Sequence, residues 1–300
     1  MHPHTERIPT LSLALFIVAF LLTACVAQPS QTPILVIPTS ILTMLPSPAV
    51  TPTPDATAPV SVVCTQTKGE IRRFEFTTDL LKYPLKVNVY MPPCYSAKGS
   101  QTYPVLYMLH GMTDTNQQWI DLGLTDAADK LIAQGDIHPL IIVMPNEDSW
   151  QLTPEQSKYE DAIVDVLIPW VDEHFSTCSA RQCRAIGGLS RGGNWAVKIG
   201  LEHWDLFAAI GAHSTPLFSG GISWLTQATA NLPSIYDAPA MYLDVGNKDE
   251  NLRQVTEFES TLTELGIAHE FHQNTGYHEA AYWSAHVTDY LLWYASILEK

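Results

Sequence analysis

The chain has 300 residues, of which 46% are hydrophobic and 16% are charged, and its formal net charge is -15 at pH 7. This acidity, together with the lack of any Lys/Arg cluster, argues against nucleic acid as a partner. About 240 residues follow the N-terminal region, which is enough for one sizeable core and fits a single α/β domain.

Residues 1–24 have the pattern of a signal peptide. Arg7 supplies a thin positive start, and residues 11–22 form an apolar stretch too short to span a bilayer comfortably. The sequence Leu-Thr-Ala-Cys ends at Cys25 and resembles the bacterial lipobox, which predicts cleavage before this cysteine and attachment of lipid to it. The alternative is an ordinary secretory signal with an incidental cysteine. The lipobox favours an extracytoplasmic protein that a lipid anchors to the bacterial cell membrane.

Residues 25–59 are rich in proline, threonine and serine and include a Thr-Pro-Thr-Pro sequence at 51–54. Proline lacks a backbone N–H and has a fixed φ, so this segment cannot build a helix or a strand ladder. We therefore expect an extended tether that holds a folded domain, residues 60–300, off a membrane surface. A diacylglyceryl cysteine offers more than one acyl chain for such anchoring.

Four further cysteines, Cys64, Cys94, Cys178 and Cys183, would lie in an oxidising compartment, where disulfides form. Three connectivities are possible. Cys178 and Cys183 flank a tight polar turn, so we pair them, and we pair Cys64 with Cys94 by default. A metal site is the less favoured interpretation, because the spacing is wrong for one and no histidine sits beside these cysteines.

Strand-like runs alternate with helical ones through the domain, which predicts an α/β fold with a mainly parallel sheet and helices on both faces. Residues 70–78 and 85–91 alternate apolar with polar side chains and should form an antiparallel opening pair. Residues 105–109 and 140–144 are continuous apolar runs, as expected of central strands that are covered on both faces. Further strands are predicted at 208–212, at 240–245 and, as a late edge strand, at 268–272.

Helical periodicity is clearest over residues 155–175, where large apolar side chains recur with a period near 3.6. Pro169 falls inside this run and predicts a kink or a restart of the helix. Other helices are predicted at 193–204, 256–265 and 280–298.

Residues 188–192 read Gly-Leu-Ser-Arg-Gly and match the G-x-S-x-G elbow. The elbow stands between a short strand-like run, 184–187, and the helix predicted at 193–204. Glycines at these positions let a strand turn sharply into a helix, which leaves the hydroxyl of Ser190 exposed at the positive end of the helix. A serine hydroxyl becomes a useful nucleophile only beside a base that a carboxylate orients.

The carboxylate should follow the serine in the chain, because α/β hydrolases have the order Ser, Asp or Glu, His. Asp249 lies just past the carboxyl end of the strand predicted at 240–245, where an active-site residue is expected. Asp244 lies within that strand and is better interpreted as structural. Glu250 is a third candidate. We favour Asp249 as the acid.

The base is predicted to be His278, which lies in a loop before the last helix. The rival histidines downstream of Ser190 are three. His269 and His272 fall in the predicted edge strand, and His286 falls inside the last helix, where a half-buried histidine is usually a packing residue.

An oxyanion hole needs two backbone N–H groups that point at the developing negative charge. Arg191, directly after Ser190, should supply one of them at the start of the helix. The other is assigned to Met112, in the loop after the strand at 105–109, with Gly111 allowing close approach of the backbone. The simpler interpretation is that His110 and Gly111 only form a turn.

Several segments together resemble the Putative esterase family, which includes esterase D (S-formylglutathione hydrolase), feruloyl esterases, enterochelin esterases and the antigen 85 mycolyltransferases. The resemblance covers residues 71–298 and departs from many members at 274–277, where Asn-Thr-Gly-Tyr precedes the histidine. It is carried by the block 103–112 with Trp119, the helix 159–175 with its Ile168-Pro169 pair, the elbow 186–193, Asp249, and Tyr277-His278 with Trp283.

The resemblance implies an α/β-hydrolase fold and a serine carboxylic-ester hydrolase that needs no metal or organic cofactor. His278 would take the proton from Ser190, Asp249 would fix the imidazole, and Met112 and Arg191 would hold the oxyanion of an acyl-enzyme pathway. The substrates would be small-molecule or glycan esters outside the cell, with carbohydrate-linked esters among the candidates.

Three other functions remain open at this point. An acyltransferase of the mycolyltransferase type would use the same triad with a different acceptor, and a surface lipoprotein could bind glycans without chemistry. A peptidase is less favoured because the domain leaves no room for a propeller or lid. Five aromatic residues could line a substrate cleft, although core or rim positions are the slightly favoured interpretation: Trp119, Trp150, Trp224, Tyr277 and Trp283.

Overall fold

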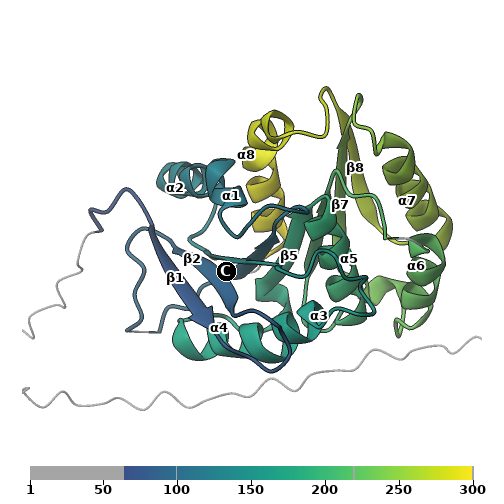
Figure 1. The fold of residues 1–300 in the computed structure, drawn as a ribbon. Coiled ribbons are helices and arrows are strands. Elements are labelled where there is room, and N and C mark those ends of the chain that lie inside the picture. The colour runs from purple at the N-terminus through teal and green to yellow at the C-terminus, as the bar shows by residue number, and fades with distance from the viewer. Residues whose placement is uncertain (1–63, 99, 219, 299–300) are drawn as a thin grey trace, which may run out of the picture. The chain divides into compact units, whose positions relative to one another are not determined.

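The computed structural model describes residues 64–98, 100–218 and 220–298 (Figure 1). The predicted signal peptide, the lipidation site Cys25 and the tether at 25–59 lie outside these residues. Within the described part of the chain, none of the helices has the length and apolar character needed to cross a membrane.

In the described residues, eight strands form one sheet in the order β1-β2-β4-β3-β5-β6-β7-β8. The opening pair is antiparallel, β2 also runs antiparallel to β4, and all other neighbours are parallel. The predicted mainly parallel α/β fold is therefore confirmed, including the opening hairpin. The strands are β1 (Glu70–Phe76), β2 (Leu85–Met91), β3 (Val105–Leu109), β4 (Ile141–Pro145), β5 (Arg184–Leu189), β6 (Ala209–His213), β7 (Ala240–Gly246) and β8 (His269–Asn274).

The burial of each strand explains its sequence pattern. Strands β3, β4 and β6 are buried at every position, which is why they read as continuous apolar runs. Strands β1 and β8 form the two edges of the sheet, and their residues alternate between partly buried and exposed. The predicted late edge strand is confirmed as β8.

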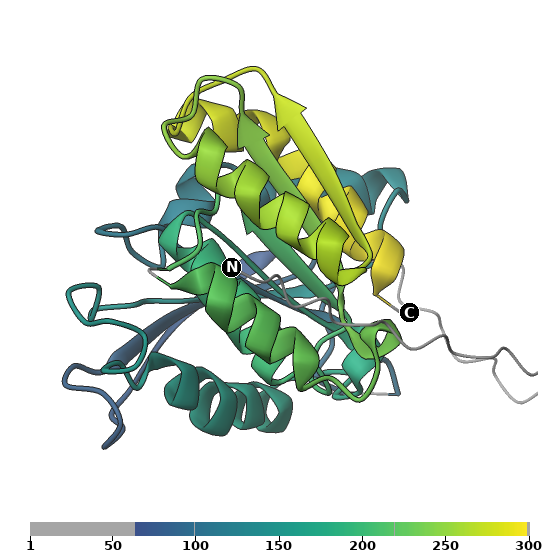
Figure 2. The same ribbon diagram turned by 90° about the vertical axis from the view of Figure 1, so that its right-hand side faces the viewer.

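Helices cover both faces of the sheet (Figures 1 and 2). Helices α2 and α8 enclose one core layer with the side chains of one face, and α4, α5, α6 and α7 enclose the other layer. The helices are α1 (Gln118–Asp121), α2 (Leu124–Gln134), α3 (Tyr159–Asp161), α4 (Ile168–His174), α5 (Arg191–Glu202), α6 (Gly221–Ala230), α7 (Leu252–Leu265) and α8 (Ala280–Ile297).

The helix predicted at 155–175 is divided, and it begins later than expected. Gln156 and Ser157 both donate backbone hydrogen bonds to the carbonyl of Thr153, so this stretch is a turn, and α3 starts at Tyr159. A π-helix, η1 (Ala162–Leu167), then precedes α4, which carries Pro169 in its first turn. Proline cannot donate into the preceding turn, and the wider π turn accommodates its ring. The chain stays helical across Pro169, so the predicted kink or restart takes the form of a change from π to α hydrogen bonding at Ile168.

Two disulfides join the four remaining cysteines. The structure pairs Cys64 with Cys94 and Cys178 with Cys183, which are the two pairs expected from the sequence. The first bond ties the start of the described chain to the end of β2. The second closes the turn that leads into β5.

Candidate active site

Ser190 occupies the sharp turn between β5 and α5. Its φ is 51°, a left-handed value that is costly for a residue with a side chain. The turn is held by the backbone, since the Ser190 N–H donates to the His213 carbonyl at 2.9 Å and the Ser190 carbonyl accepts from the Asn194 N–H at 3.1 Å. A Cβ on Gly192 would fall 2.3 Å from the Leu109 carbonyl oxygen, so only glycine fits where α5 meets β3.

The structure brings Ser190, His278 and Asp249 together at the carboxyl ends of three strands. The Nε2 atom of His278 lies 3.0 Å from Ser190 Oγ, and its Nδ1 atom lies 2.9 Å from Asp249 Oδ2. Because a carboxylate only accepts, Nδ1 carries the proton and Nε2 is free to accept from the serine hydroxyl. Asp249 follows β7 and His278 follows β8, as the sequence predicted.

Asp249 is held as a carboxylate. Burial alone would raise its pKa, but hydrogen bonds from His278 and from the Asn251 N–H, the latter at 2.7 Å, keep the pKa of Asp249 below its usual value. The Nδ2 atom of Asn251 also lies 3.3 Å from His278 Nδ1. Sequence reasoning missed Asn251, although its place two residues after an active-site aspartate, as an Asx-type turn, was a usable signal.

The loop after β3 lies against the first turn of α5, where the two predicted oxyanion donors stand. Gly192 packs on the carbonyls of Leu109 and His110, and the Gly111 N–H donates to Gln118 Oε1 at 2.7 Å. The Gly111 N–H is therefore occupied within the protein. Met112, the next residue, is 55% exposed.

The side chain of Arg191 forms a buried ion pair that the sequence did not reveal. Its Nε and Nη2 atoms donate to the two carboxylate oxygens of Glu147 at 2.8 and 2.7 Å. Glu147 follows β4, and its side chain is only 3% exposed. A bidentate pair of this kind fixes both partners in one geometry. The signal available in the sequence was the position of Glu147 just past a strand's carboxyl end.

His110 connects this ion pair to the loop after β3. Its Nε2 atom accepts from the Glu147 N–H at 2.7 Å, so the proton is on Nδ1, which donates to the Gly111 carbonyl at 2.7 Å. Burial lowers the pKa of His110 and favours this neutral form. His110 therefore holds two loops in register as a neutral group, which is more than the simple turn considered for His110 and Gly111.

Asp244 lies in the core, away from His278. Its Oδ1 atom pairs with Nδ1 of His213 at 2.8 Å, and its Oδ2 atom accepts from the hydroxyls of Tyr282 and Tyr290 at 2.6 and 2.8 Å. The Nε2 atom of His213 in turn lies 3.1 Å from the Tyr294 hydroxyl. This network, the Asp244 cluster, sits under the nucleophile turn because the His213 carbonyl accepts from Ser190.

The competing histidines make other contacts. The Nδ1 atom of His269 lies 2.8 Å from the Ile267 carbonyl, His272 stacks on Tyr242, and His286 lies 3.3 Å from Asp289. Within the described residues, no group of three or more His, Cys, Asp or Glu side chains is arranged to hold a metal ion.

The five aromatic residues do not share one environment. Trp119 and Trp283 are buried in the core, and the Trp224 indole N–H donates to Glu202 at 2.7 Å. Trp150 and Tyr277 are exposed. Trp283 approaches the ring of His278 edge-on, with centroids 5.0 Å apart, and so supports the base from the side. The core interpretation therefore holds for the two buried tryptophans.

Comparisons with known proteins agree with this geometry. The model of the family described as Putative esterase matches residues 78–294, well over half of the chain. An esterase of Mycobacterium tuberculosis is 28% identical over 257 residues, covering 68% of this chain and 55% of that protein. The endo-1,4-beta-xylanase/feruloyl esterase of Xylanibacter ruminicola is 32% identical over 227 residues, covering 68% of this chain and 29% of that protein. The chain thus spans about half the length of the first relative, and less of the second.

The fold has solved counterparts as well. A ferulic acid esterase superposes with a TM-score of 0.68 at 26% identity, covering 77% of this chain and 100% of that chain. The sheet order and the serine turn agree with the family match. The chain has the α/β-hydrolase fold and belongs to the Putative esterase family.

Proposed function

We propose that the protein is a serine carboxylic-ester hydrolase in which Ser190, His278 and Asp249 form the catalytic triad. The observation that carries the proposal is the continuous hydrogen-bonded chain from Asp249 through His278 to Ser190 Oγ, with separations of 2.9 and 3.0 Å. A nucleophile, a base within reach and an orienting carboxylate are the parts that acyl transfer requires.

In the first step, Ser190 Oγ attacks the ester carbonyl carbon while His278 Nε2 takes the hydroxyl proton. The carbonyl oxygen becomes an oxyanion, which the backbone N–H groups of Met112 and Arg191 stabilise. The C–O bond to the alcohol then breaks, and His278 returns the proton to the departing oxygen. The acid remains on Ser190 as an ester. Asp249 holds the imidazole in the correct tautomer and stabilises its cation.

In the second step, water attacks the acyl-enzyme. His278 takes a proton from the water, a second oxyanion forms in the same place, and the bond to Ser190 Oγ breaks to release the carboxylic acid. The enzyme returns to its starting protonation state, because the proton taken from water passes back to Ser190. No metal or organic cofactor takes part in this scheme.

We infer that the substrates are esters outside the cytoplasm, including esters linked to carbohydrate. The feruloyl esterase named among the relatives supports the carbohydrate link. The two disulfides support an oxidising compartment. The lipobox at Cys25 supports anchoring to the cell membrane, with the segment 25–59 as tether.

The first test is hydrolysis of p-nitrophenyl acetate, butyrate and octanoate and of a feruloyl ester by the purified full chain. We expect Ser190→Ala to lower kcat by at least about 10³-fold, because the nucleophile is lost while the fold is kept. Ser260→Ala, a change at an exposed serine on α7, is the matched control and should behave like the parent. A fluorophosphonate probe should label the parent and the control but not Ser190→Ala. Undiminished turnover by Ser190→Ala would overturn the assignment.

A further inference from the structure

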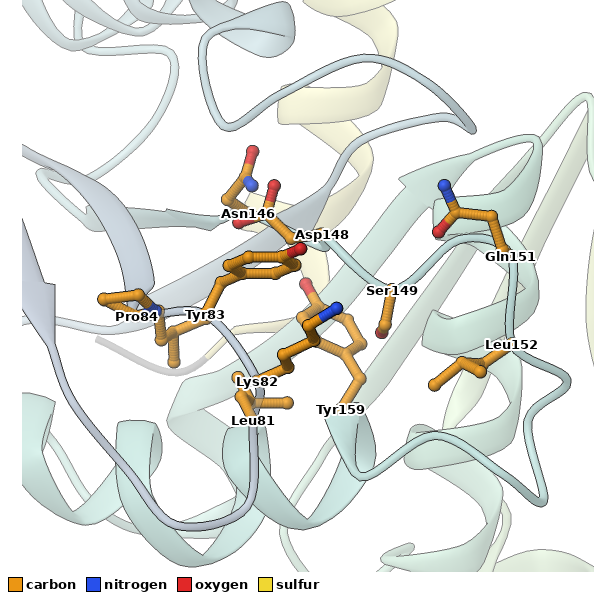
Figure 3. A pocket seen from close by; sticks show the side chains of 11 residues that line it. Leu81, Lys82, Tyr83, Pro84, Asn146, Asp148, Ser149, Gln151, Leu152 and Tyr159 are labelled. Carbon is orange, nitrogen blue, oxygen red and sulfur yellow. The ribbon is translucent and has the colours of Figure 1, made fainter.

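A cavity lies between the β1–β2 hairpin and the loop after β4. Its volume is about 370 Å³, within the range of pockets that hold small ligands. We name it the hairpin pocket, because residues 81–85 from the β1–β2 hairpin form one wall (Figure 3). The other wall consists of Asn146, Asp148, Ser149, Gln151 and Leu152 from the loop after β4, with Tyr159 from α3.

Hydrogen bonds connect the lining of the hairpin pocket to the start of α5 and to the loop after β3. Glu147 stands between two of its lining residues and holds the guanidinium of Arg191, which also donates to the Leu152 carbonyl at 3.2 Å. On the other side, Asn146 Oδ1 accepts from the Asn116 N–H at 3.0 Å, in the loop after β3. That loop also carries Met112. The pocket therefore adjoins the active site on the side of the proposed oxyanion donors.

Tyr159 lines the hairpin pocket and has a buried, unpaired hydroxyl. The residue is 1% exposed, and Trp195 packs against its ring edge-on with centroids 5.5 Å apart. Its hydroxyl has no hydrogen-bond partner among the residues the structure describes. Figure 3 shows this hydroxyl directed toward Tyr83 and Asp148. Native proteins rarely leave a buried hydroxyl unpaired, so the Tyr159 hydroxyl is free to pair with a ligand group at this place.

The chemistry of the lining matches an uncharged ligand with many hydroxyl groups. Amide, hydroxyl and carboxylate groups of Asn146, Ser149, Gln151 and Asp148 supply donors and acceptors together. Tyr83, which is 52% exposed, offers an aromatic face on which the C–H side of a sugar ring can pack. The Lys82 ammonium and the Asp148 carboxylate give the lining one charge of each sign, so it favours neither an anion nor a cation, and an alkyl chain would leave the Tyr159 hydroxyl and the amides unpaired.

We propose that the hairpin pocket is a glycosyl subsite, which binds a sugar residue of the substrate while the ester carbonyl lies at Ser190. This inference rests on the proposed ester hydrolysis and adds the part of the substrate that the protein recognises beyond the ester. Tyr159 would bind a sugar hydroxyl, and Tyr83 would carry the ring face.

The test compares esters that share one acyl group, chosen as the group turned over fastest in the p-nitrophenyl series. The kcat/KM of the methyl ester is measured against the kcat/KM of the xylobiose and cellobiose esters. Tyr159→Phe removes one hydroxyl and keeps the ring on Trp195. We expect it to lower the ratio of sugar-ester to methyl-ester kcat/KM about five- to tenfold for at least one disaccharide. Tyr83→Ala should lower the same ratio.

Tyr236→Phe is the matched control. Tyr236 is 90% exposed in η3 (Ile235–Asp237), which precedes β7 and so lies at the opposite end of the strand from Asp249. This variant should keep the ratio of the parent. An unchanged ratio in Tyr159→Phe would overturn the glycosyl subsite. If the kcat/KM values of both esters fall equally, the pocket belongs to the acyl group or to the fold.

The failure of the proposed function would look different. If the parent hydrolyses no ester, the ester hydrolase assignment falls, and the subsite is then tested by direct binding of free xylobiose and cellobiose in saturation-transfer NMR. Binding to the parent that Tyr159→Phe weakens about five- to tenfold would keep the subsite. Absence of binding by the parent to either disaccharide would overturn it.

Discussion

His110 and Glu147 hold the surroundings of Ser190 with groups that never touch the proposed triad. The imidazole accepts from the Glu147 backbone, and the Glu147 carboxylate holds the side chain of Arg191, whose own N–H is a proposed oxyanion donor. These contacts depend on His110 being neutral, because a protonated imidazole has no acceptor nitrogen. The charge state of one buried residue thus controls the alignment of two loops.

This dependence gives a pH prediction for stability. Burial lowers the pKa of folded His110 below the ordinary 6.5, so between these two values the unfolded chain binds a proton that the folded chain does not. His110 therefore stabilises the fold above about pH 6.5 and loses that contribution as the pH falls, with a limiting slope of about 1.4 kcal/mol per pH unit. Urea unfolding at pH 7.5, 6.5, 5.5 and 5.0 measures it. The free energy of unfolding should fall more steeply for the parent than for His110→Gln, and equal slopes would contradict the prediction.

At the residue scale, the sequence predicted the positions of groups that lie on characteristic local patterns, and their catalytic roles remain proposals. Ser190 stands in an elbow motif, and Asp249 and His278 follow in a fixed order after strands. Glu147 and Asn251 have only a positional signal in the sequence, because the side chains that they meet across the fold, Arg191 and His278, cannot be read from it. A bidentate contact between the residues after β4 and β5 leaves no trace in the spacing of either.

Strands β5 and β6 each have a glycine where helix α8 packs on them. A Cβ on Gly187 would fall 1.7 Å from the Tyr294 hydroxyl, and a Cβ on Gly211 would fall 1.8 Å from it. The hydroxyl can therefore reach His213 and the Asp244 cluster only because both strands lack a side chain there. Helix α8 can pack this closely on β5 and β6 because Gly187 and Gly211 have no Cβ.

A double-mutant cycle tests this match. Gly211→Ala should lower the free energy of unfolding by about 1–3 kcal/mol, because the added methyl group collides with the Tyr294 hydroxyl. Tyr294→Phe removes the hydroxyl and should relieve part of that cost, so the double variant should lose less stability than the sum of the two single changes. Tyr294 Cζ would still lie 2.6 Å from the new Cβ, which limits the relief. Additive losses in urea unfolding would show that the collision does not occur.

The strands and the helices α4, α5, α7 and α8 were predicted from the sequence, whereas α1, α2 and α6 were not, and neither was the internal form of the helix predicted at 155–175. The continuous apolar runs predicted β3 and β4, and Pro169 predicted a restart in the long helix. The π-helical turns of η1 did not follow, because a proline interrupts hydrogen bonding without specifying how the chain accommodates it. The 3.6-residue period also extended too far back, over a turn that the Thr153 carbonyl closes.

At the scale of the whole molecule, two disulfides constrain the unfolded chain to different extents. The bond between Cys64 and Cys94 spans 30 residues, and the bond between Cys178 and Cys183 spans five.

The alternation of strands and helices predicted the α/β class, whereas the position of β4 between β2 and β3 depends on the direction of each crossover and was not readable. The segments before Cys64 remain predictions.

Removing each disulfide separately should reveal the difference. The loop-entropy relation gives a loss of roughly 3–4 kcal/mol for the pair Cys64→Ala and Cys94→Ala, and of about 2 kcal/mol for the pair Cys178→Ala and Cys183→Ala. Both effects arise in the unfolded state, so the folded β strands should keep their circular dichroism. Urea unfolding of the two double variants provides the measurement. An equal or larger loss in the second variant would contradict a loop-length origin.

The Cys64–Cys94 bond also determines how the molecule would carry mechanical load. Cys94 follows the end of β2, and because β2 runs antiparallel to β4, that end lies at the amino edge of the parallel strands. Ser190, Asp249 and His278 follow the carboxyl ends of β5, β7 and β8, at the opposite edge. A pulling force applied at Cys64 would therefore be transmitted through the Cys64–Cys94 disulfide to the end of β2, at the amino edge of the parallel strands. Tension from shear flow or from a moving surface would reach the β1–β2 hairpin before it reached the proposed catalytic groups.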